Sequence, residues 1–582
     1  MSDTKQDVLD MLRELAELTM LEEGDPQSFR VRAYESAAQA IAARATDLGR
    51  LTDKELQKIQ GIGKSTAAKI RELIETGHVE KLEGLRKKHP ASVVALLKIP
   101  GLGPKTVKKL RAELGVQSLE DLRAAIADKK LRGLAGLGAK AEEKLAQTIA
   151  RLEQQGSIGR TPISVALPLA ERIVARLQEV PGVTHASYCG SLRRFSETVG
   201  DIDVIVASTA PAAVMDALVS MNVVDRVLGR GDTKTSIVTR RGTQVDVRVV
   251  EHAALGAARL YFTGSKGHNI KLRQRALARE WTLNEYALSE VEGGRVVARE
   301  TEEQIYEALG LPWIPPVLRE DCGEIEAAEA GALPKSIGAI AGDFHVHTTV
   351  SGDGRSPLEE VVAAARARGY RVLAITDHAE GTLSGVGREA LLEQRARIRA
   401  LQKEVGPSLA LLHGIELNIG ASGELDYDPE FRAAFDWCLA SVHDHFELDR
   451  AAQTRRVVTA MQDPSVRMIG HLSARMIGAR PGIDLDLDAI VAAAEKTGTA
   501  LEINGGLPRL DMSVEALRRA RESGVTFVVT SDAHDARELE RVHYAARNAE
   551  RAWVPADRVA NAWPGERLLS WVKKPKSSHA SA

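Results

Sequence analysis

The sequence predicts a multidomain α/β protein with a helical N-terminal region, a mixed central region and a C-terminal barrel of alternating strands and helices. Residues 1 to about 155 place apolar side chains at helical spacing between short glycine-containing breaks. From about residue 160 to 318, helical stretches mix with strand-like runs such as DIDVIVAS and TQVDVRVV. From Asp343 onward, short apolar runs alternate with Ala- and Arg-rich helical segments, which is the rhythm of a closed or distorted βα barrel.

Composition and cysteine usage indicate a soluble protein of a reducing compartment. A chain of 582 residues exceeds what one hydrophobic core can serve and predicts about four domains. Hydrophobic residues make up 44% and charged residues 27%, which is ordinary for globular protein. Three widely spaced cysteines build no disulfide framework. No run reaches the ~20 apolar residues of a membrane span, and no signal core is present. We therefore expect a cytoplasmic protein without a membrane partner.

Three glycine turns in the helical region predict contacts with a polyanion: Gly61-Ile62-Gly63-Lys64, Gly101-Leu102-Gly103-Pro104-Lys105 and Gly136-Leu137-Gly138-Ala139-Lys140. Such a turn leaves the backbone N–H groups of the next helix open to a phosphate, and a following lysine adds charge. Between Gly61 and Arg111, 12 Lys and Arg stand against 4 Glu and no Asp. The turns resemble helix-hairpin-helix motifs. We expect the first two to bind the DNA backbone through Gly61, Gly63, Lys64, Gly101, Gly103 and Lys105, whereas a purely structural role also explains the third.

A first set of chemistry-bearing residues lies in the segment GSLRRFSETVGDID, residues 190–203. Asp201 and Asp203 alternate along one predicted strand and so face the same side, and Asp246 lies in a second strand-like run. Three carboxylates on neighbouring strands suit two Mg²⁺ or Mn²⁺ ions that also bridge substrate phosphates. The residues that would hold a triphosphate, the arginine by charge-assisted hydrogen bonds, are Gly190, Ser191 and Arg194.

This constellation, together with the YFTGS run at residues 261–265, resembles the family X DNA polymerases, the relatives of polymerase beta, from about residue 5 to 315. The resemblance implies a helical lyase-like domain (1–85), fingers with helix-hairpin-helix motifs (86–158), a nucleotidyltransferase-type α+β palm (159–253) and a mainly helical, mixed thumb (254–318). A stretch rich in Ala, Gly and Glu (319–341) is predicted as a linker before the C-terminal region (342–582).

The resemblance also implies roles for single residues. Asp201 and Asp203 would bind both metal ions, and Asp246 would ligate the catalytic ion and help to activate the primer hydroxyl. The implied nucleotide-binding residues are Arg160, Ser191, Arg194, Gly200, Tyr261, Phe262, Gly264, Asn269 and Arg273. Two residues depart from the pattern: Gln244 replaces an arginine that steers the third carboxylate in animal members, and Lys266 occupies an acidic position. We expect altered rate or nucleotide affinity, not inactivity.

Lys69, on the helix after the first glycine turn, matches the Schiff-base lysine of the family. Its amine could attack the aldehyde of a base-free sugar if neighbouring cations lower its pKa. Ser65 and Gln57, however, occupy positions that are basic in the animal enzymes, and Phe29 replaces a histidine. A solvated helix lysine or a plain phosphate contact therefore remains an equal alternative to lyase activity.

A second set of polar residues follows the predicted strands of the C-terminal region: His345, His347, Asp353, His378, Glu416, His443, His471, Asp532 and His534. βα barrels place their sites at the C-terminal ends of strands, and a core would not tolerate so many unpaired polar groups. Mixed imidazole and carboxylate ligation suits Mn²⁺, Zn²⁺ or Fe²⁺ better than Mg²⁺. The contexts FHVHTT, ITDH, GIEL, SVH, GHL and SDAH resemble the PHP domain of polymerases and histidinol phosphatase. That resemblance implies a distorted (βα)7 barrel, up to three ions with Glu416 bridging two of them, and phosphoester hydrolysis.

We therefore expect a bacterial enzyme that fills short gaps in damaged DNA, with a PHP domain that trims 3′ ends or cuts at abasic sites. The expected partners are gapped or nicked duplex DNA and deoxynucleoside triphosphates, and no obligate protein partner is evident. Two alternatives remain open. The front half could be a non-synthesising DNA-binding module that delivers a PHP nuclease, or the PHP domain could be a small-molecule phosphomonoesterase.

Overall fold

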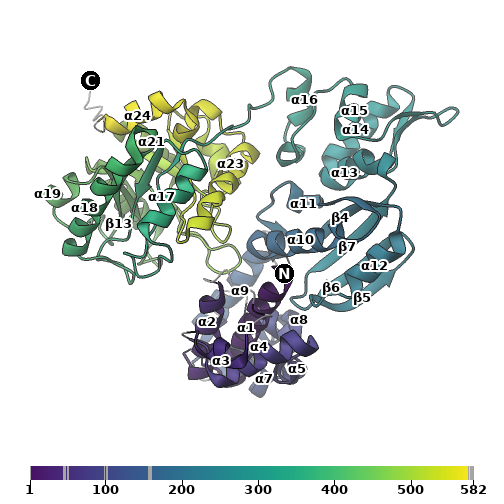
Figure 1. Cartoon of the computed structure of the whole chain (residues 1–582), viewed down its shortest axis with the longest axis horizontal. Coiled ribbons are helices and arrows are strands. Elements are labelled where there is room, and N and C mark those ends of the chain that lie inside the picture. Colours follow the sequence, from purple (N-terminus) through teal and green to yellow (C-terminus); the bar gives the residue numbers. More distant parts are fainter. Residues whose placement is uncertain are drawn as a thin grey trace. The chain divides into compact units, whose positions relative to one another are not determined.

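The computed structural model describes residues 2–25, 27–42, 48, 51–59, 61–97, 99, 102–134, 136–154, 160–574 and 576. The chain divides into two compact units. Figure 1 labels the helices and strands, coloured along the sequence. The first unit comprises Met1–Thr161 and Ala210–Arg248, and the second comprises Pro162–Thr209 and Val249–Ala582. In the described part of the chain, no helix is both long enough and apolar enough to cross a membrane.

The N-terminal part of the first unit is helical, as the apolar spacing predicts. Its elements are α1 (Ser2–Glu23), α2 (Phe29–Ala42), α3 (Asp53–Gln57), α4 (Lys64–Thr76), α5 (Glu80–Lys88), α6 (Ala91–Leu96), α7 (Pro104–Leu114), α8 (Leu119–Ala127), the 3-10 turn η2 (Lys130–Gly133) and α9 (Ala139–Gln154). One face of α1 supplies Val8, Leu12 and Leu15, which are fully buried in a continuous apolar core with the other helices. The remainder of this unit holds α12 (Pro211–Val219) and the antiparallel strands β5 (Val224–Arg230), β6 (Lys234–Thr239) and β7 (Gln244–Val250).

The segment of the second unit before the barrel combines helices with two groups of strands. Its elements are α10 (Ile163–Gln178), β2 (Val183–Tyr188), α11 (Gly190–Arg193), β3 (Thr198–Val199), β4 (Asp201–Ser208), η3 (His252–Ala254), α13 (Leu255–Thr263), α14 (Lys266–Leu277), β8 (Trp281–Leu283), β9 (Leu288–Glu290), β10 (Val296–Ala298), α15 (Glu302–Ala308), η4 (Pro316–Leu318) and α16 (Glu324–Glu329). Strands β2 and β4 pair antiparallel, and α10 packs against both. Strands β8, β9 and β10 form a separate antiparallel sheet.

A buried ion network ties these pieces together. The Glu302 carboxylate accepts hydrogen bonds at 2.7 Å from both Nη1 and Nη2 of Arg193, and one at 2.6 Å from Nη1 of Arg319. Arg319 is fully buried although it begins the stretch that the sequence predicts as a linker. Because a buried charge is stable only when it is paired, the loop after η4 must stay packed against α11 and α15.

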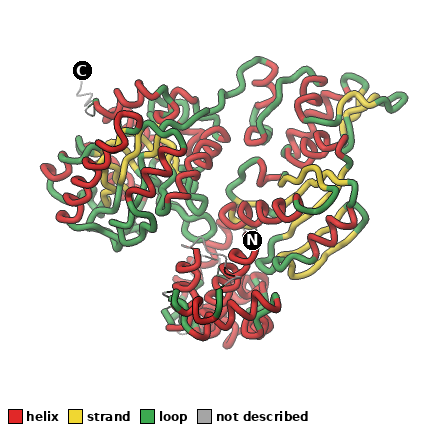
Figure 2. Tube along the Cα trace, in the orientation of Figure 1, coloured by secondary structure: helices red, strands yellow, loops and turns green. Residues whose placement is uncertain are grey.

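The C-terminal region is the barrel that the alternating pattern predicts, with strands inside a ring of helices (Figure 2). Its seven strands are parallel and follow chain order: β11 (Gly342–Asp343), β12 (Val372–Ile375), β13 (Ala410–Asn418), β14 (Trp437–Ser441), β15 (Val466–Ile469), β16 (Ala500–Asn504) and β17 (Phe527–Thr530). A parallel bridge between Val346 and Ala533 joins the two outer strands just beyond their ends and nearly closes the barrel. The helices are α17 (Leu358–Ala367), α18 (Arg388–Val405), α19 (Pro429–Ala433), α20 (Arg450–Gln462), α21 (Leu487–Thr497), α22 (Val514–Ala520), α23 (Val542–Arg551) and α24 (Gly565–Lys573), with short 3-10 turns at Gly406–Ser408, Ala536–Arg541, Ala556–Arg558 and Ala560–Ala562.

Alternation along the barrel strands separates two apolar layers. On β12, Leu373 and Ile375 join the large cluster under the helices, whereas Val372 and Ala374 join a smaller interior cluster. That interior cluster includes Trp437 and is completed by apolar side chains of α24, whose Trp571 lies 5.5 Å from Trp437 between ring centroids. Aromatic packing fills the barrel in this way, and the polar side chains gather at the carboxyl ends of the strands.

Trp437 is the largest fully buried side chain of the protein. Replacing it by alanine leaves a cavity in the barrel, and we expect Trp437→Ala to lower the free energy of unfolding of this domain by roughly 3–5 kcal/mol. The shift of the urea midpoint measures the effect. Leu392→Ala removes a side chain that is 48% exposed on α18 and should change stability by less than about 0.5 kcal/mol. Equal shifts for the two variants would contradict the barrel packing.

Candidate active sites

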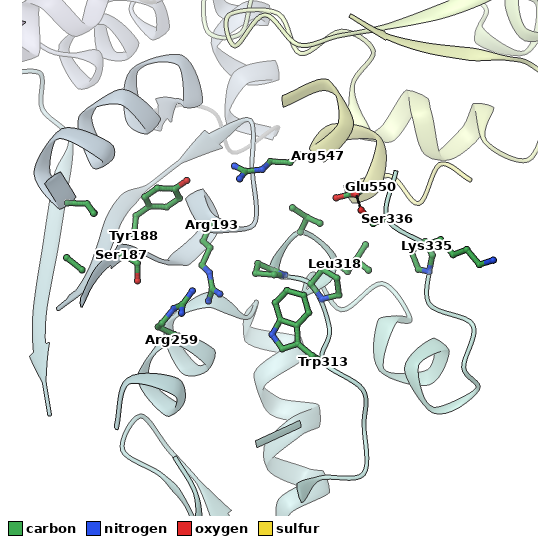
Figure 3. A pocket seen from close by; sticks show the side chains of 16 residues that line it. Ser187, Tyr188, Arg193, Arg259, Trp313, Leu318, Lys335, Ser336, Arg547 and Glu550 are labelled. Atoms are coloured by element: carbon green, nitrogen blue, oxygen red, sulfur yellow. Dashed lines mark hydrogen bonds between the residues drawn. The ribbon is translucent and has the colours of Figure 1, made fainter. Parts of the chain in front are cut away.

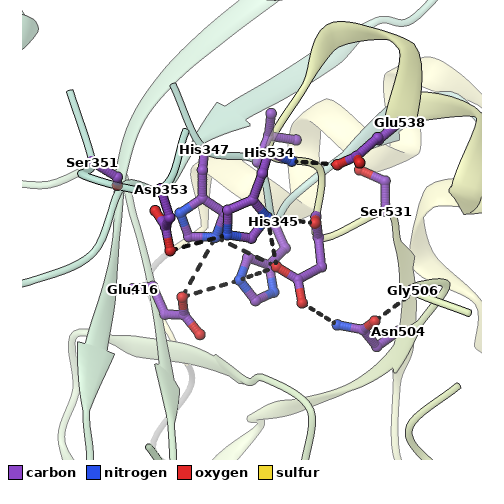
Figure 4. Close-up of polar contacts among 12 residues, drawn as sticks. His345, His347, Ser351, Asp353, Glu416, Asn504, Gly506, Ser531, His534 and Glu538 are labelled. Atoms are coloured by element: carbon purple, nitrogen blue, oxygen red, sulfur yellow. Dashed lines mark hydrogen bonds and ion pairs between the residues drawn. The ribbon is translucent and has the colours of Figure 1, made fainter. Parts of the chain in front are cut away.

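All nine candidate ligands of the C-terminal region converge at the carboxyl end of the barrel. Figure 4 shows His345, His347, Asp353, Glu416 and His534 among them. The residues come from widely separated segments: His345, His347 and Asp353 follow β11, His378 follows β12, Glu416 lies on β13, His443 follows β14, His471 follows β15, and Asp532 and His534 follow β17. Parallel strands all end at the same rim, so one residue after each strand suffices to build a cluster. Most of these side chains are buried.

The Glu416 carboxylate lies at the centre of this cluster. Its Oε2 lies 2.9 Å from His378 Nδ1 and 3.2 Å from His345 Nε2, and its Oε1 lies 3.1 Å from His471 Nε2. His443 Nε2 lies 3.3 Å from the same Oε1. Both carboxylate oxygens therefore face imidazole nitrogens on two sides, as a carboxylate that bridges two cations would.

The arrangement fits divalent metal ions. Four overlapping groups place their ligand atoms within 4.8 Å of one another, and two of them contain Glu416. In the described part of the chain, both Glu416 oxygens and both ring nitrogens of His347 and His443 are buried without a hydrogen-bond partner. Such atoms are costly to bury. A donor set of imidazole nitrogens and carboxylate oxygens is the chemistry that binds Mn²⁺, Zn²⁺ or Fe²⁺.

Two further buried carboxylates, Glu502 and Asp377, support these residues, and sequence reasoning missed Glu502. Glu502 on β16 accepts a 2.6 Å hydrogen bond from Thr530 Oγ1 and lies 2.6 Å from His345 Nδ1, which fixes the ring with Nε2 toward Glu416. Asp377 accepts hydrogen bonds from the Thr348 backbone and hydroxyl, both at 2.7 Å. It therefore holds the loop that follows β11. A fully buried acid inside an apolar strand, as in ALEIN, is the signal that could have revealed Glu502.

Burial and the charges of neighbouring groups set the protonation of the histidines in the cluster. Burial disfavours protonated His345, but Glu416, Glu502 and Asp532 outweigh it and raise the pKa of His345 well above its usual value. At His378, burial likewise disfavours the protonated ring. Glu416 and Asp353 outweigh this effect and raise the pKa of His378 to about 10. Burial and the neighbouring His534 lower the pKa of His347 to about 3. Imidazolium protons thus neutralise the buried carboxylates in the absence of other cations, and a metal ion must displace them.

Metal binding should therefore release protons. At pH 7 a His378 with a pKa of about 10 is protonated, so it must lose its proton to ligate, and Mn²⁺ affinity should fall as the pH is lowered. Calorimetric titration of metal-free protein with Mn²⁺ in buffers of different ionisation enthalpy measures the number of protons released. The exposed His445, outside the cluster, supplies the control variant His445→Ala, which should release as many protons as wild type. Metal binding without proton release would contradict the charge arrangement.

Asp201 and Asp203 open β4, on either side of the buried Ile202. The turn before this strand explains why the pattern needs a glycine. Gly190 has a φ of +62°, and a Cβ at this position would lie 2.5 Å from Oδ2 of Asp203. The Cys189 N–H donates to the Asp203 carbonyl at 2.8 Å, which fixes the turn against the strand. The Gly-Ser lead-in therefore leaves room for the carboxylate.

Asp246 lies on β7, and its carboxylate has hydrogen-bond partners in Lys234, Gln244 and Ser236. Lys234 Nζ lies 2.9 Å from its Oδ2, and the Gln244 amide donates to its Oδ1 at 3.0 Å. Burial raises the pKa of Asp246, but hydrogen bonds from Lys234 and Gln244 outweigh it and lower the pKa below the usual value. Gln244 thus orients the third carboxylate, although it stands where the family resemblance implies an arginine.

The candidate nucleotide-binding residues of the second unit fall into two groups. Tyr261, Phe262, Gly264, Asn269 and Arg273 lie together: Asn269 Nδ2 donates to the Tyr261 carbonyl at 2.7 Å, and the Arg273 guanidinium lies 5.0 Å from the Tyr261 ring centroid. A Cβ at Gly264 would lie 2.3 Å from the Asn269 amide oxygen, so only glycine fits this turn.

The other group, Ser191, Arg194 and Gly200, lies in the turn and loop between β2 and β4. Its Arg194 donates from Nε to Glu320 Oε1 and from Nη1 to the Thr263 carbonyl, both at 2.8 Å. Arg160 lies in the first unit. Through the hydrogen bond from Arg194 to the Thr263 carbonyl, this group meets the group around Tyr261 at the end of α13.

The glycine turns have the geometry that phosphate contacts require. Gly61 has a φ of +91°, and Gly63 and Gly103 are the N-caps of α4 and α7 without a side-chain cap. The first backbone N–H groups of these two helices are therefore not satisfied by a capping side chain. Lys64 follows the Gly63 cap directly, and Lys105 follows the Gly103 cap after Pro104. Gly101 lies outside the described residues.

Lys69 is half-buried on α4. Its Nζ donates to the Ser65 hydroxyl at 2.8 Å and to the Ser65 carbonyl at 3.1 Å, and it lies 5.9 Å from the Tyr34 ring centroid. Burial lowers its pKa below the usual value. A lysine with a lowered pKa is a better nucleophile at neutral pH.

Comparisons with known protein families follow the same division of the chain. The model of a helix-hairpin-helix domain matches residues 3–79, a SAM-like helix-hairpin-helix tandem matches 93–151, the DNA polymerase beta thumb matches 258–320, and the PHP domain matches 343–505. These matches define the class: a polymerase beta-type DNA enzyme with a PHP domain on the same chain.

Relatives give the family. The chain is 37% identical over 574 residues to the DNA polymerase/3′-5′ exonuclease PolX of Bacillus subtilis (strain 168), covering 98% of this chain and 99% of that protein. It belongs to this bacterial PolX family. It is also 28% identical to DNA polymerase lambda of Rattus norvegicus over 46% of this chain and 48% of that protein. A probable phosphatase of Shewanella sediminis is 28% identical over 40% of this chain and 93% of that protein.

Proposed function

We propose that this protein fills short gaps in DNA by two-metal nucleotidyl transfer and that its PHP domain hydrolyses phosphodiesters at the 3′ end or at abasic sites. Membership of the PolX family supports both activities. The single observation that carries the proposal is the complete cluster around Glu416, because a domain that only bound DNA would not need nine converging ligand side chains. The space that Gly190 leaves for Asp203 supports synthesis in the same chain.

In the polymerase site, Asp201, Asp203 and Asp246 would hold two Mg²⁺ or Mn²⁺ ions. When bound, such ions favour the attacking primer hydroxylate and the pyrophosphate leaving group. Arg160, Ser191, Arg194 and Gly200 would bind the triphosphate of the incoming nucleotide. Gln244 and Lys234 keep the Asp246 carboxylate oriented and ionised. Tyr261, Phe262 and Gly264 would pack on the sugar, with Asn269 holding their backbone in place and, like Arg273, reaching the minor groove.

In the PHP site, the nine cluster residues would hold up to three Mn²⁺, Zn²⁺ or Fe²⁺ ions, with Glu416 between two of them. Such ions supply a nucleophile at neutral pH and neutralise the phosphate oxygens. Glu502 would keep His345 in the ligating orientation. The open amides at Gly63 and Gly103, with Lys64 and Lys105, would bind the backbone of gapped or nicked DNA without reading its sequence. The reaction would take place with bacterial DNA in the cytoplasm.

A lyase step is a second candidate, and the burial-lowered pKa of Lys69 favours it. The Lys69 amine would form a Schiff base with the aldehyde of a base-free sugar, releasing water, before the 3′ phosphate is eliminated. Trapping with borohydride on abasic DNA tests it: Lys69→Ala should lose the adduct, and Lys54→Ala, at an exposed position of α3, is the control. No covalent adduct with wild-type protein would leave Lys69 as a phosphate contact.

The two-site proposal is tested on one-nucleotide-gapped DNA with Mn²⁺ and deoxynucleoside triphosphates. We expect Asp203→Ala to lose synthesis by at least about 100-fold and to keep degradation, and His345→Ala to lose degradation by a similar factor and keep synthesis. The exposed Asp232→Ala should retain both activities. Synthesis that survives in Asp203→Ala would leave a DNA-binding module in front of a nuclease. Faster turnover of histidinol phosphate than of DNA would make the PHP domain a phosphomonoesterase.

Gly190→Ala tests the turn before β4 separately. A methyl group there would lie 2.5 Å from an Asp203 oxygen and must displace the carboxylate, so synthesis should fall roughly 100-fold while degradation is unchanged. Single-turnover nucleotide incorporation is the measurement. Gly84→Ala, on α5 where a methyl group has open space around it, is the matched control. Normal incorporation by Gly190→Ala would show that the Asp203 position is not needed.

A further inference from the structure

The loop between α11 and β4 contacts the PHP domain at three points within the second unit. Both Nη atoms of Arg475 donate to the Glu197 carboxylate, at 2.9 and 3.0 Å. The Phe195 ring stacks on Tyr544 with 5.8 Å between centroids. Arg551, the last residue of α23, donates to Ser196 Oγ at 3.3 Å. The candidate triphosphate loop is thus held by the PHP domain as well as by its own strands.

Helix α23 also borders a cavity of roughly 570 Å³ beside this loop. Figure 3 shows Arg193 and Arg259 pointing into it from one side, with Arg547 and Glu550 of α23 on the other. The helix therefore faces the polymerase part of the chain with a row of charged side chains. From the same helix, Arg551 makes a contact that leads to Arg194, a candidate nucleotide-binding residue.

That contact runs through Glu320, which two arginines share. Arg194 Nε and Arg551 Nη2 both donate to Glu320 Oε1, at 2.8 and 3.1 Å. The three side chains are at most 19% exposed, so solvent screens the charges little. Burial raises the pKa of Glu320, but Arg551 and Arg194 outweigh it and lower the pKa, so the carboxylate stays charged.

Glu320 fixes one edge of the Arg194 guanidinium, and the Thr263 carbonyl fixes another. The third nitrogen, Nη2, is engaged by neither. A planar guanidinium held at two positions keeps a single orientation, in which Nη2 is the atom left to meet a phosphate oxygen. Holding it in place lowers the entropy cost of binding a triphosphate.

We infer that Arg551 of the PHP domain is a positioning residue for the incoming nucleotide: through Glu320 it holds Arg194 in the orientation that binds the triphosphate. The inference rests on the proposed role of Arg194. Loss of Arg551 has two effects of the same sign. Glu320 loses one of its two anchors and can swing with Arg194, and its negative charge is no longer balanced, so it repels the triphosphate.

The test is steady-state gap filling and degradation by the full chain. Arg551→Met should raise the KM for the deoxynucleoside triphosphate roughly three- to ten-fold, with kcat within about two-fold. Degradation of the DNA 3′ end should be unchanged, which also shows that the PHP domain is folded. Arg519→Met is the matched control, because this arginine lies on α22 with its side chain 52% exposed and, within the described ranges, pairs with Asp488 of the barrel domain at 2.9 Å.

A double-mutant cycle shows whether the effect passes through Glu320. In a Glu320→Gln background, Arg551→Met should add no further increase in KM. An unchanged KM in Arg551→Met, or an increase that persists in the Glu320→Gln background, overturns the inference. Arg194→Gln separates this result from the proposed function: if it too leaves KM unchanged, the triphosphate site itself is misplaced. If Arg194→Gln raises KM while Arg551→Met does not, only the positioning role fails.

Discussion

The buried negative charge of Glu416 is the constraint on which the barrel domain depends. A carboxylate without exposure can exist only if cations compensate its charge, and His345 and His378, whose pKa values are both raised, lie within 3.2 Å of its Oε2. His471 and His443 place two further imidazole nitrogens within 3.3 Å of its Oε1. To bring them there, strands β11 to β15 must run parallel and end at one rim. Glu502 and Asp377 then fix the ligands and the loop that carries them. The apolar interior around Trp437 closes the opposite part of the barrel, so polar groups have only one end to occupy.

In the polymerase part of the chain, the backbone of two turns lies very close to functional side chains, and this constrains the structure as much as charge does. Gly190 lies so near the Asp203 carboxylate that no side chain fits, and Gly264 lies equally near the Asn269 amide. Both glycines let a turn pass directly beside a functional group. Glu302 binds Arg193 and Arg319 next to them, so the turn that carries Ser191 is anchored to α15 and to the segment after η4. The proposed triphosphate site would thus be built on backbone that has little freedom.

Much of this architecture could be predicted from the sequence. Helical spacing with glycine breaks predicted the N-terminal helices, and alternating strands and helices predicted the barrel, because both periodicities are local. The nine candidate ligands could be named from their place after each strand, and the structure brings all nine together. Glu502 could not be predicted as part of the site, because the role of an acid inside an apolar strand depends on its partner. That partner, His345, lies 157 residues away in the sequence.

Local pattern, then, determined the elements, the glycine turns and the identity of the chemical groups, since each depends on residues close in the chain. Only the tertiary structure decided which groups are paired. Gln244 holds Asp246 in place of an expected arginine, because the neighbouring strand supplies Lys234 as a second partner. Arg194 donates a hydrogen bond to Glu320, which is 126 residues away in the sequence. Arg551, 231 residues from Glu320, donates to the same carboxylate. Such pairings depend on which surfaces fold against each other, and charge balance in a buried place is a property of that contact and not of any single segment.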